Sequence, residues 1–115
     1  MSIPVKDAYG DVYPNYIPVN HPDTAVEVVQ YVFKDQAPLF LRIMDAETNF
    51  DCDSVSYKNP NSTAKGCFQI LDGTWRDHKC KGDDHYDFRA NILCAYKLYL
   101  ANGTTDWNAS KENWE

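Results

Sequence analysis

Apolar residues recur at helical spacing in the first third of the chain. Asp23 is able to cap a helix, and the segment that follows it should continue to about Asp35. Its apolar face would consist of Val28, Val29, Val32 and Phe33. The pattern therefore predicts a first helix between residues 23 and 35.

A second helix is expected from Pro38, because proline suits the first turn of a helix. Its apolar stripe would be Leu39, Ile43, Ala46 and Phe50. Glu47 lies on the flank of this stripe. A carboxyl group in partly apolar surroundings can keep its proton near neutral pH and deliver it to a leaving oxygen. Glu47 is therefore the first candidate for catalysis.

The pattern changes after residue 50. Residues 51 to 71 indicate a small irregular sheet, with a turn at Asn59–Ser62 and a short strand at Cys67–Leu71. Residues 72 to 78 indicate a short helix around Trp75. Taken with the two earlier helices, these elements predict a mainly α (α+β) fold.

A long helix is expected after Asp87, which can cap it, and Asn102-Gly103 should end it in a left-handed conformation. One face of this helix would be Phe88, Ile92, Ala95 and Tyr99. In the short tail that follows, Trp107 and Trp114 are expected to pack back on the body of the protein.

The segment from residue 1 to 22 differs in composition from the rest. It holds four prolines with three tyrosines between them, and prolines at this density prevent a regular helix. We expect an extended arm or the end of a linker here, and one domain over residues 23 to 115.

Composition and charge exclude several function classes. The chain has 115 residues, room for one core, and 17 acidic against 11 basic residues give a net charge of −6. A field of this sign disfavours nucleic acid and anionic membranes as partners. The sequence has no apolar run of 18 residues or more, so no membrane span is expected, and the opening residues lack the pattern of a secretory signal.

The four cysteines favour disulfides over a metal site. Cys52, Cys67, Cys80 and Cys94 form an even set without a Cys-x-x-Cys pair, the spacing by which zinc ligands usually come from one turn. Of the three possible pairings we favour Cys52 with Cys67 and Cys80 with Cys94, each closing a loop that contributes roughly 3 kcal/mol. The alternative is a set of four free thiols in a cytosolic protein.

Other polar clusters do not indicate a metal or a cofactor. His21, His78 and His85 are scattered along the chain, and no serine or cysteine lies in a nucleophile elbow. The aspartates around Asp84 lack the twelve-residue calcium loop with its closing glutamate. No cofactor and no metal are expected.

Several short motifs, taken together, resemble a known superfamily. In chain order they are Glu47-Thr48-Asn49-Phe50, Val55-Ser56, Gly66-Cys67-Phe68-Gln69, Thr74-Trp75 and Asn91-Ile92. Their order and spacing resemble the catalytic core of the soluble lytic transglycosylase and goose-type lysozyme superfamily, over about residues 38 to 102. The chain departs from the family pattern at Thr48, where serine is usual, at Cys67-Phe68 in place of Leu-Met, and in lacking the late A-Y-N-x-G motif.

The resemblance implies a lysozyme-like fold, a helical bundle with a small irregular antiparallel sheet beside the active-site cleft. It also implies cleavage of the β-1,4 bond between N-acetylmuramic acid and N-acetylglucosamine in peptidoglycan, with Glu47 as acid and base. Ser56, Gln69 and Asn91 match positions that line the sugar cleft, Phe68 belongs to the same motif, and the order Leu98-Tyr99 inverts a family pair whose tyrosine supplies a cleft wall.

Among the aromatic residues, Tyr57 in its polar loop is the first candidate for stacking on a sugar ring, and Tyr99 is a further substrate-binding candidate. We expect the protein to be a monomer that acts in an extracytoplasmic compartment. Its expected partner is the peptidoglycan glycan strand.

The mechanism stays open at this point. A lytic transglycosylase needs one acid, because the C6 hydroxyl of its substrate attacks and leaves a 1,6-anhydro product. A hydrolytic muramidase needs a second carboxylate, for which Asp51, Asp53 and Asp72 are candidates. A non-catalytic sugar-binding module and a disulfide-stapled structural or inhibitory protein are the alternatives to an enzyme.

Overall fold

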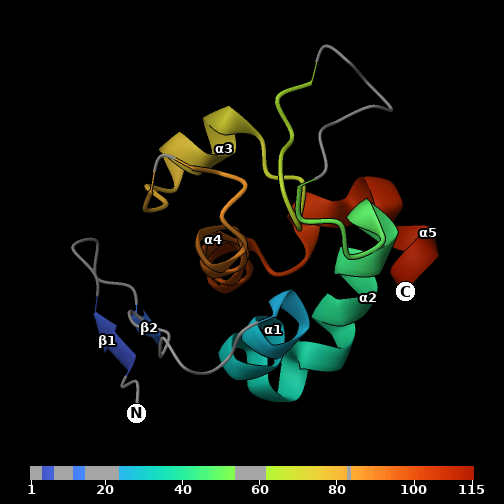
Figure 1. The fold of residues 1–115 in the computed structure, drawn as a ribbon, viewed down its shortest axis with the longest axis horizontal. Coiled ribbons are helices and arrows are strands. Elements are labelled where there is room, and N and C mark those ends of the chain that lie inside the picture. Colours follow the sequence, from blue (N-terminus) through green and yellow to red (C-terminus); the bar gives the residue numbers. More distant parts are fainter. Residues whose placement is uncertain (1–3, 7–11, 15–23, 54–61, 83) are drawn as a thin grey trace.

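The computed structural model describes residues 4–6, 12–14, 24–53, 62–82 and 84–115 (Figure 1). This part of the chain is mainly helical, as predicted. In chain order the helices are α1 (Ala25–Phe33), the 3-10 helix η1 (Lys34–Gln36), α2 (Ala37–Thr48), α3 (Asp72–Asp77), α4 (Phe88–Asn102), the 3-10 helix η2 (Thr105–Ser110) and α5 (Lys111–Trp114). Figure 1 shows α4 end-on near the centre of the view, with α1, α2 and α3 around it.

Helix α1 forms where the apolar pattern predicted it. Its four predicted core residues are each no more than 4% exposed. The cap is Thr24, whose hydroxyl accepts a hydrogen bond from the Glu27 backbone N–H at 3.2 Å. Asp23, the cap expected from the sequence, lies outside the described residues.

Helix α2 begins at Ala37, with Pro38 in its first turn, but its buried face differs from the predicted stripe. The buried side chains are Ala37, Phe40, Ile43, Met44 and Thr48. The prediction was wrong for Phe50, which is 44% exposed. The reason is that α2 ends at Thr48 and Asn49 takes a left-handed conformation with φ 52°, so the chain leaves the helical path before Phe50.

Helices α3 and α4 confirm their predicted positions. Asp87 caps α4 by accepting a hydrogen bond from the Arg89 backbone N–H at 3.0 Å, and Gly103 follows the helix with φ 65°. Buried residues lie on several sides of α4, because more than one part of the chain contacts it. Helix α1 packs against it, the Cys80–Cys94 disulfide joins it to the loop after α3, and Asn91 accepts a hydrogen bond from the Phe68 backbone.

The tail packs on the body as predicted. Trp107 is 2% exposed and Trp114 is 5% exposed. The indole N–H of Trp114 donates to the Trp107 carbonyl at 3.2 Å, and Arg42 Nε on α2 donates to the Trp114 carbonyl at 3.0 Å. The end of the chain is thereby anchored along α2.

Aromatic rings join these elements into one core. Phe33 of α1 stacks on Phe40 of α2 with 3.9 Å between ring centroids. Trp107 and Tyr99 meet the Phe40 ring edge-on, at 5.5 Å and 5.0 Å. Edge-on pairs of this kind stabilise beyond the area they bury. The rings of α1, α2, α4 and the tail therefore share one cluster.

The described parts of the N-terminal arm are two short strands. β1 (Pro4–Lys6) pairs antiparallel with β2 (Val12–Pro14), with Val5 opposite Tyr13. β2 lies near α4 (Figure 1). The described parts of the arm are therefore extended, and the rest of residues 1 to 22 lies outside the described residues.

The short strand predicted at Cys67–Leu71 is wrong. Residues 66 to 69 form a tight turn, closed by a single antiparallel bridge between Lys65 and Ile70. A polar loop followed by an apolar run suggested a hairpin. Gly66 and Gln69, however, both have positive φ angles, which bend the chain out of a strand. The irregular sheet predicted over residues 51 to 71 is not found in the described part of that segment.

Both disulfides of the favoured pairing are present. Cys52 bonds to Cys67 and Cys80 bonds to Cys94. The first joins the loop after α2 to the tight turn, and the second joins the loop after α3 to α4. Disulfides of this kind are consistent with a secreted protein.

Replacing Cys80 and Cys94 together with alanine is expected to lower the free energy of unfolding by about 3 kcal/mol, because the bond closes a loop with a sequence separation of 14. The same double replacement at Cys52 and Cys67, with a separation of 15, should cost a similar amount. Urea denaturation followed by tryptophan fluorescence measures both. A loss below about 1 kcal/mol for either pair would contradict the chain-entropy explanation.

Candidate functional site

The end of α2, which carries Glu47, lies against the tight turn formed by residues 65 to 70, called here the 65–70 turn. The hydroxyl of Thr48 makes the first link between them. Its Oγ1 lies 3.1 Å from the Cys67 carbonyl oxygen and 3.1 Å from the Met44 carbonyl oxygen of its own helix. Thr48 is 4% exposed, so this hydroxyl is held inside the protein.

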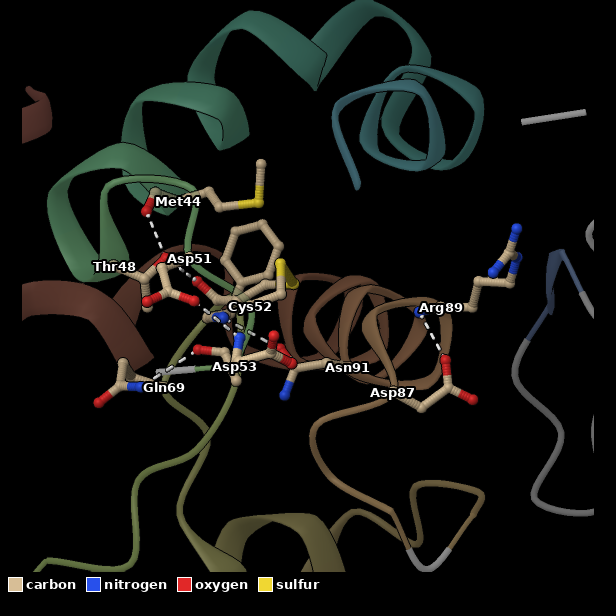
Figure 2. Close-up of a disulfide and its surroundings, with 12 residues drawn as sticks. Met44, Thr48, Asp51, Cys52, Asp53, Gln69, Asp87, Arg89 and Asn91 are labelled. Atoms are coloured by element: carbon tan, nitrogen blue, oxygen red, sulfur yellow. Dashed lines mark hydrogen bonds between the residues drawn. A yellow bond between two sulfur atoms is a disulfide. The ribbon is translucent and has the colours of Figure 1, made fainter. Parts of the chain in front are cut away.

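The Cys52–Cys67 disulfide makes the second link, four residues after Thr48 in the chain. Figure 2 shows the Thr48, Gln69 and Asn91 side chains gathered around this disulfide. Glu47 itself is half-buried, and the residue interacts with the rest of the protein. A hydrogen bond and a covalent bond therefore fix the helix end from which Glu47 projects.

Asn91 of α4 holds the 65–70 turn from the other side. Its Oδ1 accepts a hydrogen bond from the Phe68 backbone N–H at 2.9 Å. Its Nδ2 donates to the Lys65 carbonyl at 3.1 Å and to the His85 carbonyl at 2.8 Å. Both amide hydrogens and the carbonyl oxygen are used, as a buried amide requires.

Gly66 occupies a position that suits glycine alone. Its φ is +78°, and a Cβ placed there would lie 2.5 Å from Asn91 Nδ2 and 2.7 Å from the His85 carbonyl oxygen. Real Cβ atoms do not approach other atoms so closely. Asn91 Nδ2 and the His85 carbonyl oxygen are hydrogen-bonded to each other, so neither can move aside freely. The glycine of the family-like motif therefore has a structural explanation in this chain.

Trp107 completes the support of the turn. Its indole N–H donates to the Phe68 carbonyl at 3.1 Å, inside the protein. Gln69 follows with a φ of 51°, and its Nε2 donates to the Gly66 carbonyl at 3.1 Å. Gln69 is half-buried and lines a small cavity of about 60 Å³ between the turn and Trp107.

The structure separates the predicted substrate-binding residues into three groups. Gln69 is partly exposed at the turn. Phe68 and Asn91 have no exposed surface, and the Asn91 side chain holds the Phe68 backbone; contact of either residue with sugar stays a prediction. Tyr99 is half-buried and packs on Phe40, which makes it part of the core. The remaining two, Ser56 and Tyr57, lie outside the described residues.

Three aspartates were candidates for a second carboxylate. Asp51 Oδ1 accepts a hydrogen bond from the Asp53 backbone N–H at 3.0 Å, which shapes the loop after α2 (Figure 2). Asp72 Oδ1 lies 2.6 Å from Lys65 Nζ. The carboxylates of Asp51 and Asp72 therefore both have structural partners.

Asp72 forms a charged cluster at the start of α3. The hydrogen bond and the positive charge of Lys65 lower the pKa of the Asp72 carboxyl, and the charge of a protonated His85 adds to this effect. His85 Nδ1 lies 3.1 Å from the same carboxylate oxygen, in close contact and without the alignment of a hydrogen bond. The His85 ring also stacks on Trp75, with 4.1 Å between centroids.

Neither a metal site nor a membrane span is evident in the described ranges. Among them, no three His, Cys, Asp or Glu side chains gather in the way that would hold a metal ion. Within the same ranges, no helix is both long enough and apolar enough to cross a membrane.

Sequence reasoning missed two residues that build the site. Thr48 was noted only as a replacement for serine, and Trp107 only as an apolar anchor. A small hydroxyl residue directly after Glu47 was a usable signal, because a buried hydroxyl needs a partner. The contact from Trp107 to Phe68 spans 39 residues and had no local signal.

The comparisons with known proteins give no relative. No family model, no curated protein and no solved structure matches this chain.

Gly66→Ala is expected to destabilise the protein by several kcal/mol, because the new Cβ breaks the Asn91 contacts and the φ angle is unfavourable. Thermal unfolding followed by circular dichroism measures the loss. Gly103→Ala separates the two causes, since Gly103 also has a positive φ but no atom lies near its Cβ position. Gly73→Ala in α3 is a second control. Equal losses of stability in Gly66→Ala and Gly103→Ala would show that the clash of the new Cβ with Asn91 and His85 does not contribute.

Asp72→Asn is expected to destabilise the protein at neutral pH and to lose this effect in acid. Because folding lowers the pKa of Asp72, its stabilising contribution is present above the unfolded value of about 3.9 and disappears as the pH falls through the lower folded value. Urea midpoints of wild type and variant should therefore converge below about pH 4. Asp77→Asn, on the same helix, controls for the loss of one negative charge. A constant difference from pH 7 to pH 3 would contradict this assignment.

Proposed function

We propose that this chain is a peptidoglycan-degrading glycosidase of the lysozyme-like type, which cleaves the β-1,4 bond between N-acetylmuramic acid and N-acetylglucosamine. The observation that carries the proposal is the fixed end of α2. Glu47 is half-buried at this end and directly precedes Thr48, whose hydroxyl contacts a turn that matches the family-like motif in sequence. General acid catalysis requires a carboxyl group held in one place while the substrate moves against it.

In the proposed reaction, the Glu47 carboxylic acid donates its proton to the glycosidic oxygen as the bond from the sugar C1 breaks. The transition state has oxocarbenium character. The C6 hydroxyl of the same sugar then bonds to C1 and gives its proton to the Glu47 carboxylate. This sequence restores the acid and leaves a 1,6-anhydro end, so one carboxyl group is sufficient.

The partners of the aspartates are consistent with this one-acid reaction. Asp51 Oδ1 holds its own loop and Asp72 Oδ1 is paired with Lys65, so both carboxylates have a structural role. Hydrolysis by a muramidase is the second candidate, with Asp53 as the third of the aspartates considered for the second carboxylate. The two reactions give different products from the same substrate.

Two further residues fit a sugar-binding role. The Gln69 amide can both donate and accept hydrogen bonds, as sugar hydroxyl and acetamido groups require. Phe50 exposes 44% of its surface three residues after Glu47, on a backbone with φ 64°. A bulky residue seldom adopts this conformation without a reason, and an exposed ring offers an apolar face to a pyranose.

The proposed setting is extracytoplasmic, with the glycan strand as partner and a monomer as the active form. Both disulfides fit an oxidising compartment. The acidic net charge would repel an anionic wall polymer at long range, so recognition would depend on contacts within the site.

Glu47→Gln is expected to abolish the release of soluble fragments from purified peptidoglycan, with a loss of at least about a hundredfold, because glutamine has the shape but no acidic proton. The measurement is the rate of muropeptide release by liquid chromatography. Glu112→Gln, an exposed residue of α5, is the matched control and should retain wild-type activity. Equal release by wild type and Glu47→Gln would refute Glu47 as the acid.

Product mass then separates the alternatives, since an anhydro end is lighter than a hydrolysed end by one water. A hydrolysed end would indicate the muramidase reaction. If the wild type releases nothing but still sediments with intact peptidoglycan, the chain is a binding module and the enzymatic proposal fails.

A further inference from the structure

A hollow of about 260 Å³ lies beside the start of the 65–70 turn. Its described lining comes from this turn, from the first residue of α3 and from the loop before α4: Lys65, Asp72, Asp84, His85 and Tyr86. The backbone of Lys65 pairs with Ile70 through two hydrogen bonds of 3.2 Å and 3.1 Å. Because Ile70 directly follows Gln69, the hollow begins on the same turn that carries the proposed sugar contact at Gln69.

His85 forms a fixed wall of this hollow. Its ring stacks on Trp75, with 4.1 Å between centroids, and Trp75 is 4% exposed. The indole N–H of Trp75 donates to the Gly82 carbonyl at 3.1 Å, and the His85 carbonyl accepts a hydrogen bond from Asn91 at 2.8 Å. Both the ring and the backbone of His85 are therefore held in place by the fold. A site that is already formed loses less freedom when a ligand binds.

The ammonium group of Lys65 already has partners. Its Nζ lies 2.6 Å from Asp72 Oδ1 and donates to the Thr63 carbonyl at 3.2 Å. An anionic ligand would have to compete with these partners, so the pairing disfavours it. The same ion pair keeps the Asp72 carboxylate at the edge of the hollow.

Both carboxylates of the hollow keep an oxygen that can accept a hydrogen bond from a ligand. Asp72 uses Oδ1 for Lys65, and Asp84 Oδ1 accepts a hydrogen bond from the Tyr86 backbone N–H at 2.9 Å. In the part of the chain that the structure describes, Oδ2 of either aspartate has no partner. The Asp72 side chain is 43% exposed, and Asp84 is also exposed. A ligand hydroxyl group can therefore donate to each of them.

Tyr86 adds an aromatic ring and a hydroxyl group to the lining. The residue is half-buried, and its phenolic hydroxyl can both donate and accept a hydrogen bond. A pyranose ring combines hydroxyl groups with an apolar C–H face, and an aromatic ring offers a matching apolar surface. Carboxylate oxygens beside such a ring therefore suit a neutral sugar, whose hydroxyl groups need no excess of charge from the protein.

We propose that this hollow binds one sugar unit of the glycan strand, in addition to the units bound beside Glu47. Hydroxyl groups of the sugar donate to the Asp72 and Asp84 carboxylates, and one face of its ring lies against Tyr86. The volume of the hollow is just below the range for pockets that hold drug-sized ligands, which fits a single ring. The choice of a glycan as ligand rests on the function proposed above.

The test is a titration of the disulfide-bonded Glu47→Gln protein, which should bind glycan without cutting it, followed by backbone amide shifts in NMR. The probes are oligomers of N-acetylglucosamine with two and with six sugar units, and calcium chloride is the reference for a cation. With the six-unit probe we expect saturable shifts at residues 65, 72 and 84 to 86, and binding about tenfold tighter than that of the two-unit probe. Calcium should give no saturable shift at these residues.

In the same background, Tyr86→Phe should weaken binding of the six-unit probe by roughly fivefold, because it removes one hydrogen-bonding group and keeps the ring. Tyr86→Ala should weaken it further, because the ring is lost as well. Tyr31→Phe on α1, outside the hollow, is the matched control and should leave the affinity unchanged. Both phenylalanine variants should keep the fold, and unchanged amide shifts outside the hollow will verify this.

The proposal is overturned if the six-unit probe gives no saturable shift at the hollow, or if Tyr86→Phe weakens binding no more than Tyr31→Phe. Saturable shifts with calcium and none with the sugars would identify a cation site and would also overturn it. A failure of the proposed function gives a different result, since fragment release by the wild type is measured separately. A wild type that releases nothing, together with shifts at the hollow, would support the sugar site and refute the enzyme.

Discussion

The 65–70 turn is the constraint on which the rest of the structure depends. Four of its backbone groups are held by side chains from three separate elements: Thr48 of α2, Asn91 of α4 and Trp107 of η2. These contacts lie inside the protein, where an unpaired peptide group would cost about 1–3 kcal/mol. Because each anchor comes from a different part of the chain, the turn can form only when those elements are in place together.

This arrangement links the fold to the proposed chemistry. Two of the contacts that hold the turn also hold the end of α2. Thr48, on α2, donates to the Cys67 carbonyl, and the Cys52–Cys67 disulfide joins the loop after α2 to the turn. Gly66 allows α4 to approach so closely that Asn91 can reach two backbone carbonyls. A catalytic acid benefits from a rigid backbone position of this kind. Much of the rate gain from positioning comes from restricting the motion of the reacting groups.

The sequence predicted the helices well, but it gave no signal for several of the contacts that hold the 65–70 turn. Local sequence patterns located α1, α3 and α4 and the anchoring tail, with Asp87 and Gly103 at the ends of α4 as predicted; the cap of α1 is Thr24, one residue after the expected Asp23. It failed at Phe50, where the left-handed Asn49 ends α2 early, and at Cys67–Leu71, where an apolar run suggested a strand. Both failures involve residues other than glycine with positive φ angles. The hydrophobic pattern of a sequence does not predict such angles. The roles of Asn91 and Trp107 were also hidden, because each depends on contacts with residues distant in the sequence.

Contacts from several parts of the chain converge on helix α4. Its buried residues include Asn91 and Lys97, two polar side chains that packing alone would not select. Asn91 is fully used in holding the 65–70 turn, so its presence follows from the fold. Lys97 also interacts with other groups of the protein, and such interactions offset the cost of burying a charge. The buried polar positions of α4 are therefore occupied by side chains that have partners, as the burial of a polar group requires.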